Sequence, residues 1–258
     1  MPDLAGVVLA AGAGTRLAPL TRLRPKAMCP VGNRPLLDHA LDRLGPVVAP
    51  ASTAVNLHHG AAAVQEHMER EAPAVHLSHE RTVALGTAGA LGALLPWLDG
   101  RDVMVTNADL WSGPGMDVTG FVAGWDRERV RLMVVEAGGR SDFGTSRYCG
   151  LALMPDRLVR SLVAEPSGLY EASWRAEWEA GRLDLVETEA LTVDCGTPGD
   201  YLRANLVWSG GGSVIHPGAR VADGAIVDRS VVWDGSEVHR RERLTCSVRA
   251  EHLTVMVR

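Results

Sequence analysis

A short apolar run that ends in a glycine-rich turn opens the chain and points to one class of fold. Val7–Ala10 is continuously apolar, which is typical of a strand buried on both faces of a parallel sheet. Gly12-Ala13-Gly14 follows and predicts a tight turn at the carboxyl end of that strand. Ligands of open α/β sheets bind at this end of the strands, so the pattern predicts a loop site there.

Apolar patterns of strand and helix type alternate along the next two hundred residues. They predict strands at 54–57, 103–106, 131–136 and 151–154, and helices at 35–44, 61–71, 87–98, 170–180 and 199–208. Alternation of strands and helices is typical of layered α/β sheets. We therefore expect an α/β domain over residues 1–208, with a Rossmann-like layered mixed sheet.

Beyond residue 208 the pattern changes. Ser209–Ser213 is glycine-rich and reads as a linker. Four near-copies follow, in which Val221, Val227, Val232 and Val238 recur every five or six residues, each with a small residue two places earlier. This period predicts a short left-handed β-helix of hexapeptide repeats over residues 209–258, and a β-hairpin domain is the alternative. A β-helix with so few coils is better suited to packing or dimerisation than to catalysis. We therefore expect a homo-oligomer.

Composition excludes several classes of function. The chain has 258 residues and a formal net charge of -5, so no electrostatic argument favours a nucleic-acid partner. No apolar run reaches the roughly 18 residues that span a membrane, and the first residues lack a basic signal-peptide region. Cys29, Cys149, Cys195 and Cys246 are scattered, which argues against a zinc site or a disulfide framework. We expect a cytoplasmic protein that acts on a small molecule.

Lys26 is the only lysine among the 26 basic residues of the chain. A position that keeps an ammonium where arginine serves elsewhere suggests a need for a compact point charge. Glycines at 12 and 14 let backbone N–H groups turn toward one anion, and Arg16 and Lys26 add positive charge, so the segment predicts a phosphate cradle. It is neither a Walker A loop, which needs Lys directly after Gly, nor a dinucleotide fingerprint, whose third glycine falls at Leu17.

Four motifs in order resemble the nucleotidyl transferase family, the sugar-1-phosphate nucleotidylyltransferases. They are Gly12–Thr21 with Pro25-Lys26, Leu85–Leu91, Asn107-Ala108-Asp109, and Asp194–Leu202 with the pattern D-x-G-T-P-x-D-Y-L. The motifs are closest to those of the GDP-mannose pyrophosphorylase branch, in which the C-terminal repeats are also common. The resemblance implies that the chain condenses an NTP with a sugar 1-phosphate to give an NDP-sugar and pyrophosphate.

Roles for single residues follow from the resemblance. It implies that the NTP contacts Leu9, Ala11, Gly12, Ala13, Gly14, Thr15, Arg16, Gly86 and Thr87. Lys26 would meet the α-phosphate, Arg16 the leaving phosphates, and Asp109 would complete the catalytic set. Asp109 follows a predicted strand at the carboxyl edge of the sheet, and Asp194 precedes a glycine turn that could bring it alongside. Two carboxylates facing a triphosphate predict a Mg²⁺ site.

The substrate side departs from the family pattern. Longer relatives hold the sugar phosphate with a second lysine, which this chain lacks. We expect Arg140 or Arg147 to take that role, with Asn107 and Tyr148 also contacting the substrate.

The motifs do not identify the nucleobase or the sugar of the substrates. GTP and mannose 1-phosphate are the first choice, because Leu85–Gly89 resembles the guanylyltransferase turn. Other bases or sugars, by uridylyl, thymidylyl or adenylyl transfer, are alternatives. So is a catalytically weak paralogue that senses nucleotide sugars. A nucleotide-sugar glycosyltransferase is disfavoured, because those enzymes lack the G-x-G-T-R cradle.

Overall fold

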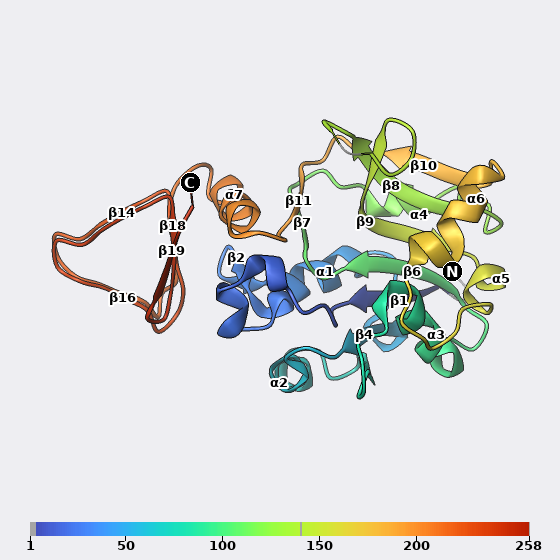
Figure 1. Ribbon diagram of the computed structural model, residues 1–258, viewed down its shortest axis with the longest axis horizontal. Coiled ribbons are helices and arrows are strands. Elements are labelled where there is room, and N and C mark those ends of the chain that lie inside the picture. The colour runs from blue at the N-terminus through green and yellow to red at the C-terminus, as the bar shows by residue number, and fades with distance from the viewer. Residues whose placement is uncertain (1–3, 140, 258) are drawn as a thin grey trace.

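The computed structural model describes residues 4–139 and 141–257 (Figure 1). Its largest element is a sheet of seven strands in the order β10-β8-β9-β6-β1-β4-β5. The strands are β1 Leu4–Leu9, β4 Thr53–Leu57, β5 His76–His79, β6 Asp102–Asn107, β8 Val130–Glu136, β9 Ser146–Met154 and β10 Leu183–Glu187. β1 pairs in parallel with β4 and β6, whereas β9 runs antiparallel to β6 and β8. The mixed α/β sheet expected from the sequence is confirmed.

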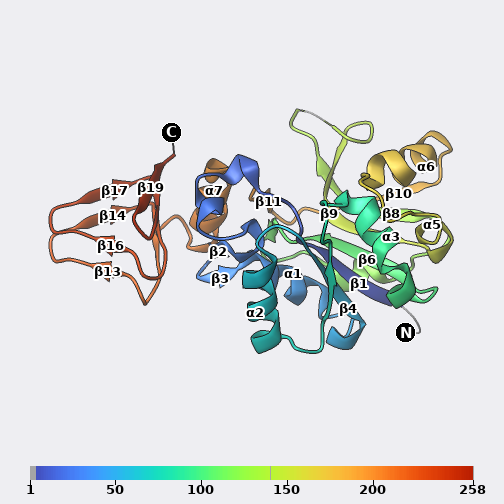
Figure 2. The same ribbon diagram turned by 60° about the horizontal axis from the view of Figure 1, so that its bottom comes forward.

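Helices cover both faces of this sheet (Figure 2). The α-helices are α1 Leu36–Leu44, α2 Ala61–Glu71, α3 Gly86–Leu98, α4 Val118–Val122, α5 Asp156–Val159, α6 Arg175–Glu179 and α7 Pro198–Trp208. Short 3-10 turns are η1 Thr15–Leu17, η2 Leu20–Arg22, η3 Lys26–Met28 and η4 Pro50–Ser52. One core joins α1, α2 and α4 to the sheet, and a second joins α3 and α5 to its other face.

Two expected elements differ from the prediction. The strand expected at 151–154 begins at Ser146, because residues 146–148 continue the ladder with β8. The helix expected at 170–180 opens with a π-helical turn, η5 Tyr170–Trp174, before α6. The helices expected at 35–44, 61–71, 87–98 and 199–208 each begin and end within one residue of the prediction.

Small sheets complete the α/β part. β2 Pro30–Val31 pairs with β3 Arg34–Pro35, and β7 Leu110–Ser112 pairs antiparallel with β11 Thr192–Asp194. The β7–β11 pair matters for the site, because it brings residues about eighty positions apart in sequence to the same sheet edge. None of the helices among the described residues is long and apolar enough to cross a membrane.

The C-terminal segment is built from short strands that form three walls, seen end-on as a triangle in Figure 1. The strands are β12 Val214–Ile215, β13 Arg220–Val221, β14 Ile226–Asp228, β15 Val231–Val232, β16 Glu237–Val238, β17 Arg243–Thr245, β18 Ser247–Ala250 and β19 Leu253–Met256. Parallel partners lie 17 residues apart on every wall, as in Val214↔Val231, Arg220↔Glu237 and Ile226↔Arg243. Small parallel sheets at the C-terminus are therefore established.

A third core joins the C-terminal segment to the α/β part. Tyr201 on α7 is fully buried, and its hydroxyl accepts a hydrogen bond from Trp233 Nε1 at 2.9 Å and donates one to the carbonyl of Pro30. Leu17 and Leu20, which follow the glycine loop, belong to this core together with Trp233. The C-terminal coils thus pack directly against the loop region that the sequence singled out.

Candidate active site

The glycine loop leaves the sheet at the carboxyl end of β1. Leu9 is the last residue of β1, and its carbonyl accepts a hydrogen bond from Ala108 N at 3.0 Å, which joins the loop to the segment after β6. Ala11 is buried, whereas Gly12, Ala13 and Thr15 are exposed. The loop thus presents its backbone at the edge where the sequence predicted a site.

Gly14 gives the loop its shape. It has φ 60°, and a Cβ there would lie 2.9 Å from the Thr21 side chain and 3.0 Å from that of Lys26. Thr21 Oγ1 donates a hydrogen bond to the Gly14 carbonyl at 3.1 Å. The backbone N–H groups of residues 12–16 make no hydrogen bond to any described residue. They remain available to an anion, as a phosphate cradle requires.

Lys26 lies beside this loop and contacts both predicted metal-binding carboxylates. Its Nζ donates a short hydrogen bond to Asp109 Oδ2 and lies 3.4 Å from Asp194 Oδ1. The lysine side chain is 10% exposed, against 32% for Asp109 and 62% for Asp194. The ammonium is therefore held in place by the two acids, which themselves open toward solvent.

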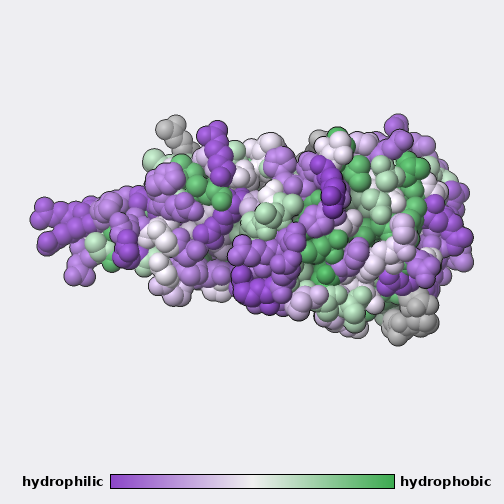
Figure 3. All heavy atoms as spheres, turned by 90° about the horizontal axis from the view of Figure 1, so that it is seen from below, coloured by the Kyte–Doolittle hydropathy of each residue, from purple (hydrophilic) through white to green (hydrophobic). Residues whose placement is uncertain are grey.

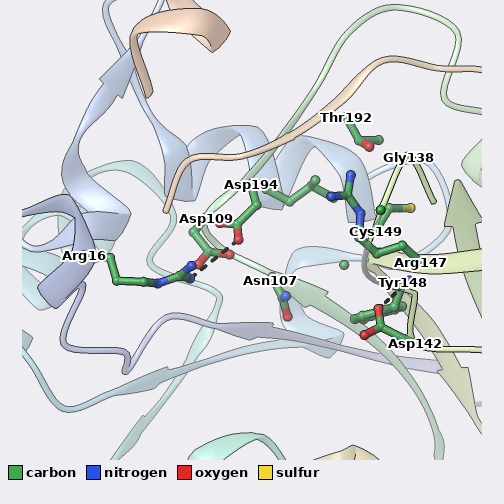
Figure 4. Close-up of a pocket in the computed structure, with 13 residues that line it drawn as sticks. Arg16, Asn107, Asp109, Gly138, Asp142, Arg147, Tyr148, Cys149, Thr192 and Asp194 are labelled. Atoms are coloured by element: carbon green, nitrogen blue, oxygen red, sulfur yellow. Dashed lines mark hydrogen bonds and ion pairs between the residues drawn. The ribbon is translucent and has the colours of Figure 1, made fainter. Parts of the chain in front are cut away.

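Strand pairing explains how Asp194 reaches Asp109. Asp194 is paired with Leu110 in the β7–β11 ladder, and Cys195 N donates to the Asp109 carbonyl at 2.9 Å. Arg16 Nη2 lies 3.7 Å from Asp194 Oδ2, an exposed pair that Figure 4 marks with a dashed line. A Cβ at position 196 would lie 3.0 Å from both groups, so glycine there leaves room for this approach.

A cavity of about 620 Å³ gathers most of the predicted polar residues (Figure 4). Its lining includes Arg16, Asn107, Asp109 and Asp194 from the sheet edge, and Arg147 and Tyr148 from the start of β9. Arg16 and Arg147 approach the cavity from opposite sides (Figure 4). Two guanidinium groups thus face a space lined by the carboxylates of Asp109, Asp142 and Asp194.

The residues predicted to contact the sugar 1-phosphate differ in where the structure places them. Arg147 is exposed and lines the cavity, whereas Arg140 lies outside the described residues. Tyr148 lines the cavity, but its hydroxyl is buried and has no hydrogen-bond partner among the described residues, and burial raises the pKa of that hydroxyl well above its usual value. Its ring packs edge-on against Trp174 with the centroids 4.9 Å apart. The Tyr148 hydroxyl is therefore not exposed to a ligand in the cavity.

The second predicted nucleotide turn lies at the start of α3, outside the lining of this cavity. Gly86 has φ 69°, and a Cβ there would lie 2.5 Å from the Ser167 carbonyl oxygen. The hydroxyl of Thr87 accepts a hydrogen bond from Leu169 N at 2.8 Å. Thr87 therefore uses its side chain to hold the 167–169 segment, and the turn can meet a ligand through its backbone.

Arg43, a buried arginine behind the site, was not predicted from the sequence. Its guanidinium donates to Thr106 Oγ1 and to the Leu110 carbonyl, both at 2.6 Å, so it holds the two ends of the segment that carries Asn107 and Asp109. Burial lowers the pKa of Arg43 to about 10. A signal was present, because position 43 falls on the buried face of α1 with Leu36 and Ala40.

Comparison with known proteins identifies the family. A model of the family described as nucleotidyl transferase matches residues 5–147, more than half of the chain. The chain belongs to the nucleotidyl transferase family. The matched region contains the glycine loop, Lys26, the Gly86-Thr87 turn and Asp109, whereas Asp194 and the C-terminal coils lie beyond it.

Similar proteins place this nucleotidyl transferase among relatives that act on sugar 1-phosphates. It is 40% identical to an N-acetylmuramate alpha-1-phosphate uridylyltransferase of Caulobacter vibrioides over 60% of this chain and 66% of that protein. It is 29% identical to a mannose-1-phosphate guanylyltransferase of Mycobacterium tuberculosis over 94% of this chain and 78% of that one. The fold also matches a solved mannose-1-phosphate geranyltransferase of Thermus thermophilus, with a TM-score of 0.70 at 18% identity over 99% and 95% of the chains.

Proposed function

We propose that this nucleotidyl transferase condenses an NTP with a sugar 1-phosphate, giving an NDP-sugar and pyrophosphate. The observation that carries the proposal is the convergence of Lys26, Asp109 and Asp194 beside a glycine loop with free N–H groups. Positive groups and an unpaired N–H row suit a triphosphate. The adjoining cavity, with Arg147 on its far side, has room for a second phosphorylated substrate.

The reaction needs no nucleophile from the protein. An anionic oxygen of the sugar phosphate forms a bond to the α-phosphorus of the NTP. The bond from that phosphorus to the bridging oxygen breaks, and the electron pair leaves with pyrophosphate. What the protein supplies is alignment of the two substrates and compensation of charge. We assign Lys26 to the α-phosphate, Arg16 to the departing phosphates and Arg147 to the sugar phosphate.

The residues present fit a Mg²⁺ ion. Asp109 and Asp194 converge on one ammonium in this structure, so their oxygens share a space that accepts a cation. No cluster of three or more candidate ligand side chains occurs among the described residues. Mg²⁺ is usually held by one or two carboxylates together with phosphates and waters, and Asp109 and Asp194 would supply the carboxylates. When bound, the ion would neutralise charge on the reacting phosphates.

GTP with mannose 1-phosphate remains the substrate pair that we favour. The guanylyltransferase of M. tuberculosis matches 94% of the chain, including the C-terminal coils. UTP with N-acetylmuramate 1-phosphate is the second candidate, favoured by the 40% identity to the C. vibrioides enzyme. Release of pyrophosphate, measured for each NTP against each sugar 1-phosphate, separates these pairs. Binding of nucleotides without turnover on any pair would favour the sensing paralogue.

We infer that residues 1–208 form the catalytic domain and that residues 209–258 form a linker and a short β-helix of hexapeptide repeats. The 17-residue spacing between paired strands on three walls supports this. Ile215, Val221 and Ile226 lie on the first strand of each wall and are 39 to 43% exposed. These apolar edges support the expectation of a homo-oligomer.

A further inference from the structure

Three loops meet at the carboxyl edge of the sheet, and a buried polar chain joins them. The glycine loop follows β1, the segment 56–60 ends β4 and leads into α2, and Glu80 follows β5. Segment 56–60 lies between the others, because His59 N donates to the Ala11 carbonyl at 3.5 Å and Glu80 N donates to the Leu57 carbonyl at 2.8 Å.

The side chains of Asn56 and Glu80 form the polar chain. Ala10 N donates to Asn56 Oδ1 at 2.7 Å, Asn56 Nδ2 donates to Glu80 Oε1 at 2.6 Å, and Leu85 N donates to Glu80 Oε2 at 2.7 Å. Asn56 is 3% and Glu80 5% exposed, so water does not replace these partners. One end of the chain is the residue before the glycine loop, and the other is the residue before Gly86.

The donor pattern demands one amide and one carboxylate at these two positions. Both ends of the chain are backbone N–H groups, so both must meet acceptors. The central contact needs one donor and one acceptor. Three acceptor atoms and one donor are therefore required, which an amide and a carboxylate supply together and which two amides or two carboxylates do not. An unmatched buried donor is costly, so the chain holds its geometry firmly.

We propose that Glu80 is a positioning residue that sets the spacing between the glycine loop and the turn at 85–87. This rests on the proposed function, which assigns both segments to the NTP. Glu80 itself does not line the cavity beside Asp109. Loss of the Glu80 carboxylate should therefore weaken binding of the NTP, with a smaller effect on binding of the sugar 1-phosphate. A general loss of stability would not separate the two substrates in this way.

An exchange of the two groups tests the proposal. Glu80→Gln leaves two amides in the chain, and Asn56→Asp leaves two carboxylates, so each single variant breaks one link. The double variant Asn56→Asp with Glu80→Gln restores every donor–acceptor match, because the new carboxylate at 56 accepts from the backbone and from the new amide at 80. Both replacement side chains keep nearly the native shape. Glu177→Gln is the matched control, since Glu177 in α6 is 4% exposed and pairs with Arg182, away from the loops.

We expect Glu80→Gln to raise the KM for the NTP on the order of tenfold or more, with a much smaller change in the KM for the sugar 1-phosphate. The double variant should return to within a few-fold of the native protein. Glu177→Gln should lower the Tm and leave both KM values unchanged. A native KM for the NTP in Glu80→Gln, or a double variant no better than the single ones, would overturn the proposal.

Equilibrium titration with GTP and with UTP separates this inference from the proposed function. If the native chain binds one of them but releases no pyrophosphate with any sugar 1-phosphate, the proposed function fails, whereas the same pattern of loss and rescue in the dissociation constants still supports the role of Glu80. If the native chain binds neither of these nor any other NTP, both proposals fail. Should Glu80→Gln not fold, recovery of folding and nucleotide binding in the double variant supports the same matching rule, and its failure contradicts it.

Discussion

Lys26 is the residue on which the proposed chemistry depends most. Its ammonium is shared by Asp109 and Asp194, and only 10% of its side chain is exposed. A guanidinium is larger and planar, so it would place its donors differently from an ammonium between these two carboxylates. The retention of one lysine in a chain that otherwise uses arginine now has a steric reason.

We therefore expect Lys26→Arg to lower kcat on the order of 10²-fold or more, with a much smaller change in NTP affinity. The positive charge is kept, but the donor no longer reaches one α-phosphate oxygen. Steady-state kinetics and direct NTP titration measure the two quantities separately. A native kcat with a raised KM alone would mean that Lys26 binds substrate and transition state equally, and its assigned role would be wrong.

Asp109 and Asp194 should both be needed for turnover. We expect Asp109→Asn and Asp194→Asn each to remove most activity, since an amide is a poorer Mg²⁺ ligand and no longer balances the Lys26 charge. Both side chains open to solvent, so the folded state should persist, as judged by circular dichroism and Tm. Near-normal rates at saturating Mg²⁺ in either variant would contradict the metal assignment.

The cysteines should react unequally in the folded protein. Burial raises the pKa of the Cys29 and Cys149 thiols from 9.0 to about 12 and moves that of Cys195 in the same direction, whereas Cys246 is partly exposed. We expect iodoacetamide at pH 8 to label Cys246 first, which mass spectrometry detects, and the other three only after unfolding.

The raised pKa values also affect stability. The unfolded chain loses the thiol protons of Cys29, Cys149 and Cys195 at a lower pH than the folded protein does, so the free energy of unfolding should fall as the pH rises from about 9 toward 12.

At the scale of elements, helix α3 is packed through glycines. A Cβ at Gly89 would lie 2.2 Å from the Glu165 carbonyl oxygen, and one at Gly92 would lie 2.3 Å from the backbone of Val163. The segment 163–167 therefore runs along the helix at backbone distance, and it ends beside the Gly86 turn. Glycine at these positions sets how closely the segment approaches the turn.

We expect Gly89→Ala to destabilise the fold by about 1–3 kcal/mol, because the added methyl group meets a backbone oxygen that cannot move freely. Gly45→Ala is the control, since Gly45 has ordinary helical φ and the nearest atom to its Cβ would lie 3.4 Å away. Urea unfolding of both variants provides the comparison. Equal midpoints for Gly89→Ala and the native protein would show that the segment yields easily.

At the scale of the whole molecule, the C-terminal coils contact the segment that carries Lys26 and so help to hold the active site in place. Arg24, two residues before Lys26, forms an ion pair with Asp234 at 2.8 Å and lies over the Trp233 ring at 4.9 Å. Trp233 in turn bonds to Tyr201 in the third core. On the face seen in Figure 3 the coils are mostly hydrophilic. The wall that packs against the α/β part is apolar.

Deletion of residues 209–258 should therefore affect both assembly and activity. It removes Trp233 and Asp234 from Arg24 and exposes the apolar face of α7, so we expect a lower Tm, lower solubility and a reduced kcat. Light scattering of the native chain and of the deletion variant reports the assembly. A soluble deletion variant with native kinetics and the native molecular mass would show that the coils support neither function.

The sequence by itself determined the longer strands and helices at the centre of the α/β part, the glycine loop and the four motifs, but not the short elements such as β7, β11 and α4. These features depend on local patterns, such as the apolar run of β1 or the valine spacing after residue 213, which involve only residues close together in the sequence. The candidate residues that line the cavity, from Arg16 to Asp194, could also be predicted from the sequence. Each lies at a strand end or in a turn, and the parallel topology brings these loops to one edge of the sheet.

Only the tertiary structure decided which groups meet. Asp194 reaches Lys26 through the β7–β11 ladder, the Tyr148 hydroxyl is buried instead of facing the cavity, and Arg43 and Glu80 hold the site from below and from the side. These contacts join residues far apart in sequence, and no local period encodes their partners. A buried polar group is stable only when its donors and acceptors are matched in three dimensions, so these roles become visible only once the fold places the partners together.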